Sequence, residues 1–115
     1  MSKSLPLIDA EVCCSPVTQA ALTPDQAESI VPRLKALADP VRLRLLSLVA
    51  AHADGEACVC ELNDAFDLSQ PTISHHLKVL HEAGLLDRQK RGTWFYYRTR
   101  PEALSELRSL LGGPA

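Results

Sequence analysis

The sequence predicts a mainly helical domain with one small β-hairpin, and three observations support this fold class. Apolar residues recur at helical spacing in several separate segments. Proline and glycine residues stand where helices would begin and end. Beyond residue 85 the helical period gives way to aromatic and β-branched residues that flank a glycine, which is typical of a hairpin. At 115 residues the chain is long enough for one domain with a modest core.

The first helix is expected to begin after Thr23. Thr23 and Gln26 have the spacing of a capping box, and Pro24 occupies the first helical position, where a missing N–H costs nothing. Apolar residues then recur with a 3.6-residue period up to residue 38. Pro32 lies inside this helix and should kink or split it, because proline cannot donate to the carbonyl one turn earlier.

A second helix should begin after Asp39 by the same capping logic. Its apolar side faces the core, and we expect Arg42 and Arg44 to be exposed. Residues 52–57 should form a loop, and residues 58–66 should form a third, short helix.

The next segment has the pattern of the second helix of a helix-turn-helix. Ser69 is a good N-cap, and a helix is expected from about residue 70 to residue 83, ended by Gly84. His76 falls in its apolar stripe and should be a hydrogen-bonded core residue. The polar side comprises Gln70, Thr72, Ser74, His75 and Lys78. In a helix-turn-helix these residues approach base edges in the major groove, and Gln70 could pair bidentately with an adenine. Alone, the same pattern also fits an amphipathic helix with a solvated face.

A basic hairpin follows, with strands expected over residues 86–89 and 93–98. Its tip would carry Lys90 and Arg91, which can reach phosphates or the minor groove. A hairpin in this position is a wing, so the sequence predicts a winged helix-turn-helix. The leucine-rich helix expected from Pro101 should pack on its own domain or on a second copy. A homodimer would match an inverted-repeat operator in double-stranded DNA.

The charge distribution supports DNA binding although the net charge is only −2. Residues 69–100 carry a net charge of +4, and the remaining residues carry −6. This asymmetry concentrates positive potential where the helix and hairpin lie, as a phosphate backbone requires. The sequence contains no membrane-length apolar run and no secretory signal pattern, so we expect a soluble, cytoplasmic protein without a membrane partner.

Four cysteines remain to be explained: Cys13, Cys14, Cys58 and Cys60. In a reducing cytoplasm, clustered thiols indicate metal binding or redox chemistry rather than structural disulfides. Residues 1–22 are expected to form a flexible arm that carries Cys13 and Cys14, in front of a DNA-binding domain over residues 23–115. Side chains two apart diverge in a regular helix, so Cys58 and Cys60 can share an ion only if Cys58 lies at a non-helical first turn.

Three segments together resemble the ArsR/SmtB family of metal-responsive repressors. They are LADPVRLRLL at 37–46, LSQPTISHHLKVL at 68–80 and AGL at 83–85. The resemblance implies a dimeric winged-helix repressor that holds its operator when metal-free and releases it when an ion binds. Residues 58–62 are similar to the family's metal box at the start of its third helix. Some members have a second site on the last helix, and we expect it to be missing here because residues 101–111 contain no histidine.

The donor set favours a soft ion, because thiolates select soft or borderline metals. Three thiolates suit As(III) or Sb(III), and four suit Cd(II), Pb(II) or Zn(II). The adjacent pair in the arm plus one thiol of the box favours three, so arsenite is the expected inducer. Whether Cys58 is a ligand, and whether the arm comes from the same subunit, stay open.

Two alternatives differ in chemistry. A thiol-oxidation sensor would keep the fold and replace the ion by disulfides. A thiol enzyme or metallochaperone would need a Cys-x-x-Cys pair, a nucleophile with its base or a phosphate loop, and the sequence has none of these, so we expect no enzyme.

Overall fold

The structure is a computed structural model, and it describes residues 21–112. The elements in chain order are α1 (Pro24–Leu37), α2 (Pro40–Ala51), a 3-10 turn (Ala53–Gly55), β1 (Glu56–Cys58), α3 (Val59–Asn63), α4 (Gln70–Glu82), β2 (Leu86–Arg91), β3 (Trp94–Thr99) and α5 (Pro101–Leu110). The strands form one antiparallel sheet in the order β1-β3-β2. The mainly helical winged fold is therefore as predicted, with one strand more than the hairpin.

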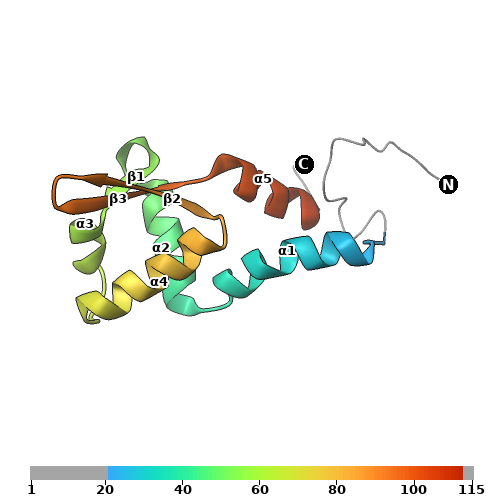
Figure 1. Ribbon diagram of the computed structural model, residues 1–115, viewed down its shortest axis with the longest axis horizontal. Helices are drawn as coiled ribbons and strands as arrows, with labels where there is room; N and C mark the ends of the chain where they lie inside the picture. The colour runs from blue at the N-terminus through green and yellow to red at the C-terminus, as the bar shows by residue number, and fades with distance from the viewer. Residues whose placement is uncertain (1–20, 113–115) are drawn as a thin grey trace.

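The two outermost helices of the described chain lie at one end of the molecule. Figure 1 shows α5 above α1 at this end, and α3 beside the tip of the hairpin at the other. An ion pair between Arg33 on α1 and Glu106 on α5 joins the two helices. Arg33 also donates to the carbonyl of Ala83 at the end of α4 (3.4 Å), so α1 is fixed to the helix-turn-helix as well.

The core lies between α2, α4 and the sheet. Its fully buried residues include Leu45, Val49, Ile73, Leu77, Leu80, Leu85 and Leu86. Those on α4 follow the spacing i, i+4 and i+7, which places them on one face of the helix. The opposite face of α4 therefore remains available to solvent.

The helix starts follow the predicted caps. The Thr23 hydroxyl accepts from the N–H of Gln26 (3.1 Å), and the Gln26 side chain closes the box by accepting from the N–H of Thr23 (2.9 Å). Asp39 accepts from the first amides of α2, and the hydrogen bond from the Arg42 amide is the main reason that the pKa of Asp39 is lowered. Gly84 follows α4 with φ of +82°, a conformation that favours glycine.

Four details of the sequence-based prediction are wrong. Residues 56–58 form strand β1 rather than loop and helix, because their backbone pairs with β3. Helix α3 ends at Asn63, three residues before the predicted end. Of the two effects predicted for Pro32, the split of the helix is wrong, because α1 continues without a break to Leu37. Arg42 is partly buried, because its guanidinium donates to the carbonyl of Ala36 (2.6 Å).

The tip of the hairpin is also displaced from its predicted position. Arg91 pairs with Trp94, so the turn consists of Gly92 and Thr93, and Gly92 has φ of +64°. Lys90 and Arg91 consequently belong to strand β2 and not to the turn. Their side chains point to opposite faces of the sheet, because successive residues alternate along a strand.

Truncating the core face of α4 should destabilise the whole domain. Leu77→Ala removes a fully buried side chain, and we expect the free energy of unfolding to fall by about 2–5 kcal/mol. Urea denaturation followed by circular dichroism measures the loss. Leu43→Ala on α2 is the matched control, because Leu43 is exposed and should change stability by no more than about 0.5 kcal/mol. Equal losses in the two variants would contradict this description of the core.

Candidate nucleic-acid interface and thiol site

The polar face of α4 is exposed along its whole length. This face carries all five of the predicted DNA contacts on the helix: Gln70, Thr72, Ser74, His75 and Lys78. The hydroxyl groups of Ser69 and Thr72 lie 2.8 Å apart, and Ser69 also accepts from the Thr72 amide as the cap of the helix. The Thr72 side chain is thus engaged locally, whereas the side chains of the other four are exposed and form no side-chain hydrogen bond within residues 21–112.

The second histidine of α4 belongs to the interior side of the helix. His76 is partly buried, and its Nδ1 lies 3.3 Å from a guanidinium nitrogen of Arg42 on α2. The structure therefore confirms that His76 is a hydrogen-bonded packing residue, distinct from the exposed His75.

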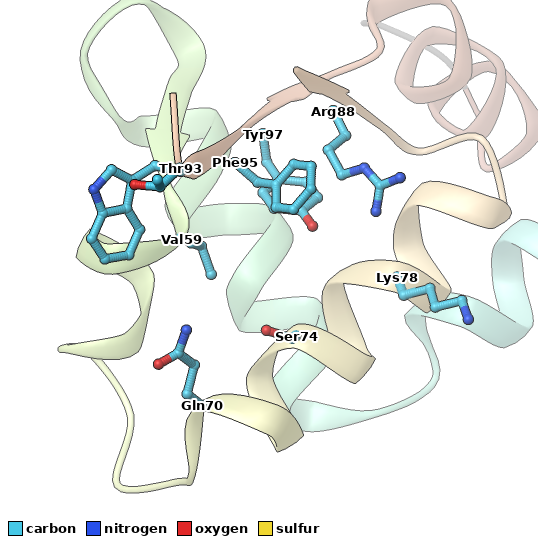
Figure 2. A pocket seen from close by; sticks show the side chains of 9 residues that line it. Val59, Gln70, Ser74, Lys78, Arg88, Thr93, Phe95 and Tyr97 are labelled. Atoms are coloured by element: carbon cyan, nitrogen blue, oxygen red, sulfur yellow. The ribbon is translucent and has the colours of Figure 1, made fainter. Parts of the chain in front are cut away.

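A groove separates α4 from the hairpin. Figure 2 shows α4 side chains on one wall, hairpin side chains on the other and two aromatic rings between them. The residues that line it are Val59, Gln70, Ser74, Lys78, Arg88, Thr93, Trp94, Phe95 and Tyr97. The helix and the wing thus form one continuous concave surface rather than two separate contacts.

The predicted wing contact Arg91 is engaged by a carboxylate. Its guanidinium donates to both oxygens of Glu56 (2.9 and 2.8 Å) and lies 4.5 Å from the ring centre of Tyr96. Arg98 approaches the same carboxylate at 3.5 Å. The hydrogen bond from Arg91 is the main reason that the pKa of Glu56 is lowered, and the same pair raises the pKa of Arg91. Arg91 could meet a phosphate only after leaving Glu56.

The thiol pair lies where the sheet becomes helix. Cys58 is the last residue of β1 and the N-cap of α3, with extended φ and ψ, so the predicted non-helical first turn is present. The Cα atoms of Cys58 and Cys60 are 5.2 Å apart, and their sulfurs are joined as a disulfide. Cys58 is buried (3% exposed) and Cys60 is partly exposed. The two sulfurs therefore converge instead of pointing to opposite sides of a helix.

A glutamate and a histidine hold this turn in place. Glu61 accepts from the backbone N–H of Cys58 (2.9 Å), and its other oxygen lies 3.0 Å from Nε2 of His52. The hydrogen bond from the Cys58 amide, followed by that from His52, lowers the pKa of Glu61. The carboxylate is therefore charged at neutral pH and fixes the backbone beneath both sulfurs.

The other two predicted ligands, Cys13 and Cys14, lie outside the described residues. Within residues 21–112 no group of three or more His, Cys, Asp or Glu side chains has the geometry to hold a metal. The described part thus brings together two of the four predicted ligands, Cys58 and Cys60.

A family model supports the sequence resemblance. Residues 39–88 match the model described as bacterial regulatory protein, arsR family. The chain is 38% identical over 77 residues to the arsenical resistance operon repressor of Bacillus subtilis, which covers 67% of this chain and 71% of that protein. The chain belongs to the arsR family. It is a DNA-binding transcriptional regulator and not an enzyme.

Another relative is more similar over a smaller share of its length. The arsenic resistance transcriptional regulator ArsR1 of Pseudomonas putida is 48% identical over 79 residues. The match covers 69% of this chain and 60% of that regulator.

Two solved structures share the fold. The AntR antimony-specific transcriptional repressor matches with a TM-score of 0.65 and 30% identity over 78% of this chain and 80% of that one. A homodimeric winged helix-turn-helix domain from Mycobacterium bovis, a possible ArsR-family regulator, matches with a TM-score of 0.60 and 29% identity over 75% of this chain and 81% of that one.

Among the described helices none has the length and apolarity needed to cross a membrane.

Three residues of this surface were missed by sequence reasoning. Arg88 and Trp94 line the groove, and Glu56 binds Arg91. Arg88 could have been found from the alternation of side chains along the hairpin, since it shares a face with Phe95 and Tyr97 of β3. Nothing local in the sequence indicates the contact between Glu56 and Arg91.

The Glu56 ion pair should make stability depend on pH. Because the pKa of Glu56 is lowered on folding, its contribution is present above the ordinary value of 4.5 and is lost as the pH falls through the lower folded pKa. Glu56→Gln should therefore be less stable than the parent protein at pH 7, and the difference should shrink as the pH falls below 4.5. Urea denaturation at a series of pH values measures both.

Glu28→Gln provides the control for this prediction. Glu28 is exposed on α1 and makes no ion pair within the described chain, so the same charge change should leave the pH dependence unaltered. A Glu56→Gln deficit that stays constant from neutral to acid pH would show that the ion pair does not stabilise the fold.

Proposed function

We propose that this protein is a homodimeric repressor of an arsenical resistance operon, which binds an inverted-repeat operator when free of metalloid and releases it when As(III) binds its cysteines. The observation that carries the proposal is the convergence of Cys58 and Cys60 at the junction of β1 and α3, next to the DNA-reading elements. Similarity to regulators named for arsenic resistance supports the choice of ion. The reducing cytoplasm, where operator DNA is found, is where such thiolates persist.

The donor chemistry fits a trivalent metalloid in part. Thiolates are ligands of soft ions, and the described box offers two sulfurs on one side of the chain. In the reduced protein these sulfurs would hold two positions of a three-sulfur site. We assign the third position to the arm, through Cys13 or Cys14, from the same subunit or its partner. Sb(III) has the same requirement, whereas Cd(II), Pb(II) or Zn(II) would engage all four thiolates.

The fold offers a direct route from this box to DNA. Cys58 pairs with Tyr96 across β1 and β3, and Arg91 lies over the Tyr96 ring in the wing. On the other side, α3 precedes α4 in the helix-turn-helix, and buried Val59 and Leu62 join its core. Pulling the arm onto the box would therefore disturb the relative position of the wing and α4, on which simultaneous contact with duplex DNA depends.

The coupling free energy between arsenite and operator sets how completely the repressor is released, and tight switching needs a coupling above the usual range. A coupling free energy of about 1–3 kcal/mol between the two ligands changes operator affinity by roughly 5–150-fold. We therefore expect saturating arsenite to weaken operator binding by a factor in this range. By reciprocity, bound operator should weaken arsenite binding by the same factor.

Replacing the exposed thiol should uncouple release from binding. Cys60→Ser should bind operator DNA as tightly as the parent protein, because Cys60 lies outside α4 and the wing, yet arsenite should no longer release it. Fluorescence anisotropy of a labelled promoter duplex, titrated with arsenite in reductant, measures both properties. Ala65→Ser is the control: it adds a serine nearby and removes no thiol. Normal release of Cys60→Ser would exclude this thiol as a ligand.

The arm is tested by its own substitutions. Cys13→Ser and Cys14→Ser should each retain operator binding, and at least one should lose arsenite release if the arm completes a three-sulfur site. Release that survives both changes would restrict the site to the box. Repeating the titration with cadmium and zinc distinguishes a four-thiolate site, because all three serine variants, Cys13→Ser, Cys14→Ser and Cys60→Ser, would then lose the response.

The contact between the Cys58 and Cys60 sulfurs also favours a second candidate, a thiol-oxidation sensor. In this case peroxide would oxidise the two thiols to a disulfide, with the two protons and the peroxide leaving as water. Operator release by peroxide, together with no response to arsenite in reductant, would support the sensor. The opposite result supports the metalloid repressor.

The terminal helices are the proposed dimer interface. Val31 and Leu34 lie one turn apart on α1 and are each 37% exposed, and Leu111 after α5 is 71% exposed. Apolar side chains exposed on adjacent elements mark a protein interface. The homologous domain from Mycobacterium bovis is homodimeric, which supports a two-fold assembly.

A charge on this face should dissociate the dimer. Leu34→Glu is expected to raise the dimer dissociation constant at least about tenfold, since it buries an unpaired carboxylate in the interface. Sedimentation equilibrium measures the change. Leu43→Glu is the control, because Leu43 is an exposed leucine on α2 away from this face. Unchanged association of Leu34→Glu would place the interface elsewhere.

A further inference from the structure

The groove between α4 and the wing has a definite internal order. Gln70, Ser74 and Lys78 are spaced four residues apart and form one stripe along α4. Figure 2 shows Lys78 and Arg88 at one end of the groove and Gln70 and Thr93 at the other, and Trp94 is a further lining residue. The rings of Phe95 and Tyr97 lie between the two walls. The lining thus has a cationic end, a row of hydrogen-bonding groups and an apolar floor.

The charge of the lining selects an anionic occupant. It contains two cations and no carboxylate. Most arginines of the sheet region are already paired: Arg91 and Arg98 with Glu56, and Arg100 with Asp87 and Glu102. Within residues 21–112, neither Lys78 nor Arg88 forms an ion pair.

An aromatic ring positions Arg88 without using its hydrogen-bond donors. The guanidinium carbon lies 4.8 Å from the centre of the Phe95 ring. Stacking of this kind orients the planar group while all of its N–H groups stay free for a phosphate. The alternation of the strand explains why Arg88 faces the groove: it pairs with Tyr97 and shares that face, whereas Arg91 lies on the other face, over the ring of Tyr96. Trp94, at the start of β3 beside the turn, still lines the groove at its edge.

We propose that this groove binds the sugar–phosphate backbone of one operator strand, with Arg88 and Lys78 on a phosphate and Trp94 against an adjacent deoxyribose. The inference rests on the proposed function and deepens it, because it identifies Arg88 as the wing's phosphate contact in place of Arg91. The α4 stripe then lies beside the strand that it holds, with Gln70 and Ser74 next to the bases. Phosphate contacts of this type fix register and orientation rather than sequence.

The salt dependence of operator affinity tests the assignment. Each phosphate contact contributes about 0.9 to the slope of log K against log salt concentration for duplex DNA. Arg88→Gln should therefore flatten the slope by about 0.9 per protomer and weaken binding to all sequences alike. Arg91→Gln should leave the slope nearly unchanged, because Glu56 already neutralises Arg91. Arg108→Gln is the matched control, an exposed arginine on α5 remote from the groove.

Neutral phosphates locate the contact on the DNA. A methylphosphonate replaces one charged phosphate of the duplex by a neutral group. At one position in each half-site, this replacement should lower the operator affinity of the parent protein, whereas it should leave the affinity of Arg88→Gln unchanged. The emission of Trp94, the only tryptophan of the chain, should change on addition of operator and return at high salt. Trp94→Phe should remove the emission signal and keep the salt slope.

The outcomes separate this inference from the proposed function. If the parent protein binds its operator and releases it with arsenite, but Arg88→Gln keeps the parental slope and the parental methylphosphonate profile, the groove does not bind the backbone. If instead Arg91→Gln flattens the slope of log K against log salt concentration, then the face of the wing on which Arg91 pairs with Glu56 is the one that contacts DNA. Failure of the parent protein to bind any promoter duplex would overturn the proposed function itself.

Discussion

The pairing of β1 with β3 is the constraint on which the rest of this structure depends. Three residues, Glu56–Cys58, pair with Tyr96–Arg98 and add β1 as the third strand of the sheet. Cys58 then ends the strand and caps α3, so its sulfur is fixed by the sheet on one side and by the helix on the other. Helix α3 precedes α4 along the chain, and β3 is half of the wing. The thiol pair is therefore linked through the backbone to both DNA-reading elements.

Features set by neighbours in the sequence could be predicted. The caps at Thr23, Asp39 and Ser69 need only a side chain and an amide two or three residues away. The apolar stripe of α4 and the glycine that ends it are equally local. These features locate the helix-turn-helix and its exposed face, and they were sufficient to place Gln70 and Lys78 on it.

Features that depend on contacts between residues far apart in the sequence could not be predicted. Residues 56–58 contain no β-branched residue and are too few to show alternation, so only their pairing with β3 makes them a strand. The pairing of Glu56 with Arg91 joins residues 35 positions apart. Arg42 was expected to be exposed for the same reason, because its acceptors on Ala36 and His76 become neighbours only when α1, α2 and α4 pack.

Charge in this domain therefore has to be counted by partner rather than by residue type. The net positive charge of residues 69–100 predicts high affinity for DNA. However, Glu56 alone pairs with two arginines of this segment, and Arg100 pairs with two further carboxylates. Each cation withheld in this way removes one phosphate contact and the counterion release that accompanies it. A coupling free energy of about 1–3 kcal/mol lowers operator affinity by roughly 5–150-fold, so it empties the operator only where the affinity of the metalloid-free protein does not far exceed what occupancy requires. Acidic residues that pair with the arginines of the sheet region thus suit a regulator that must dissociate from DNA, and they leave the phosphate contact to the cations that face the groove.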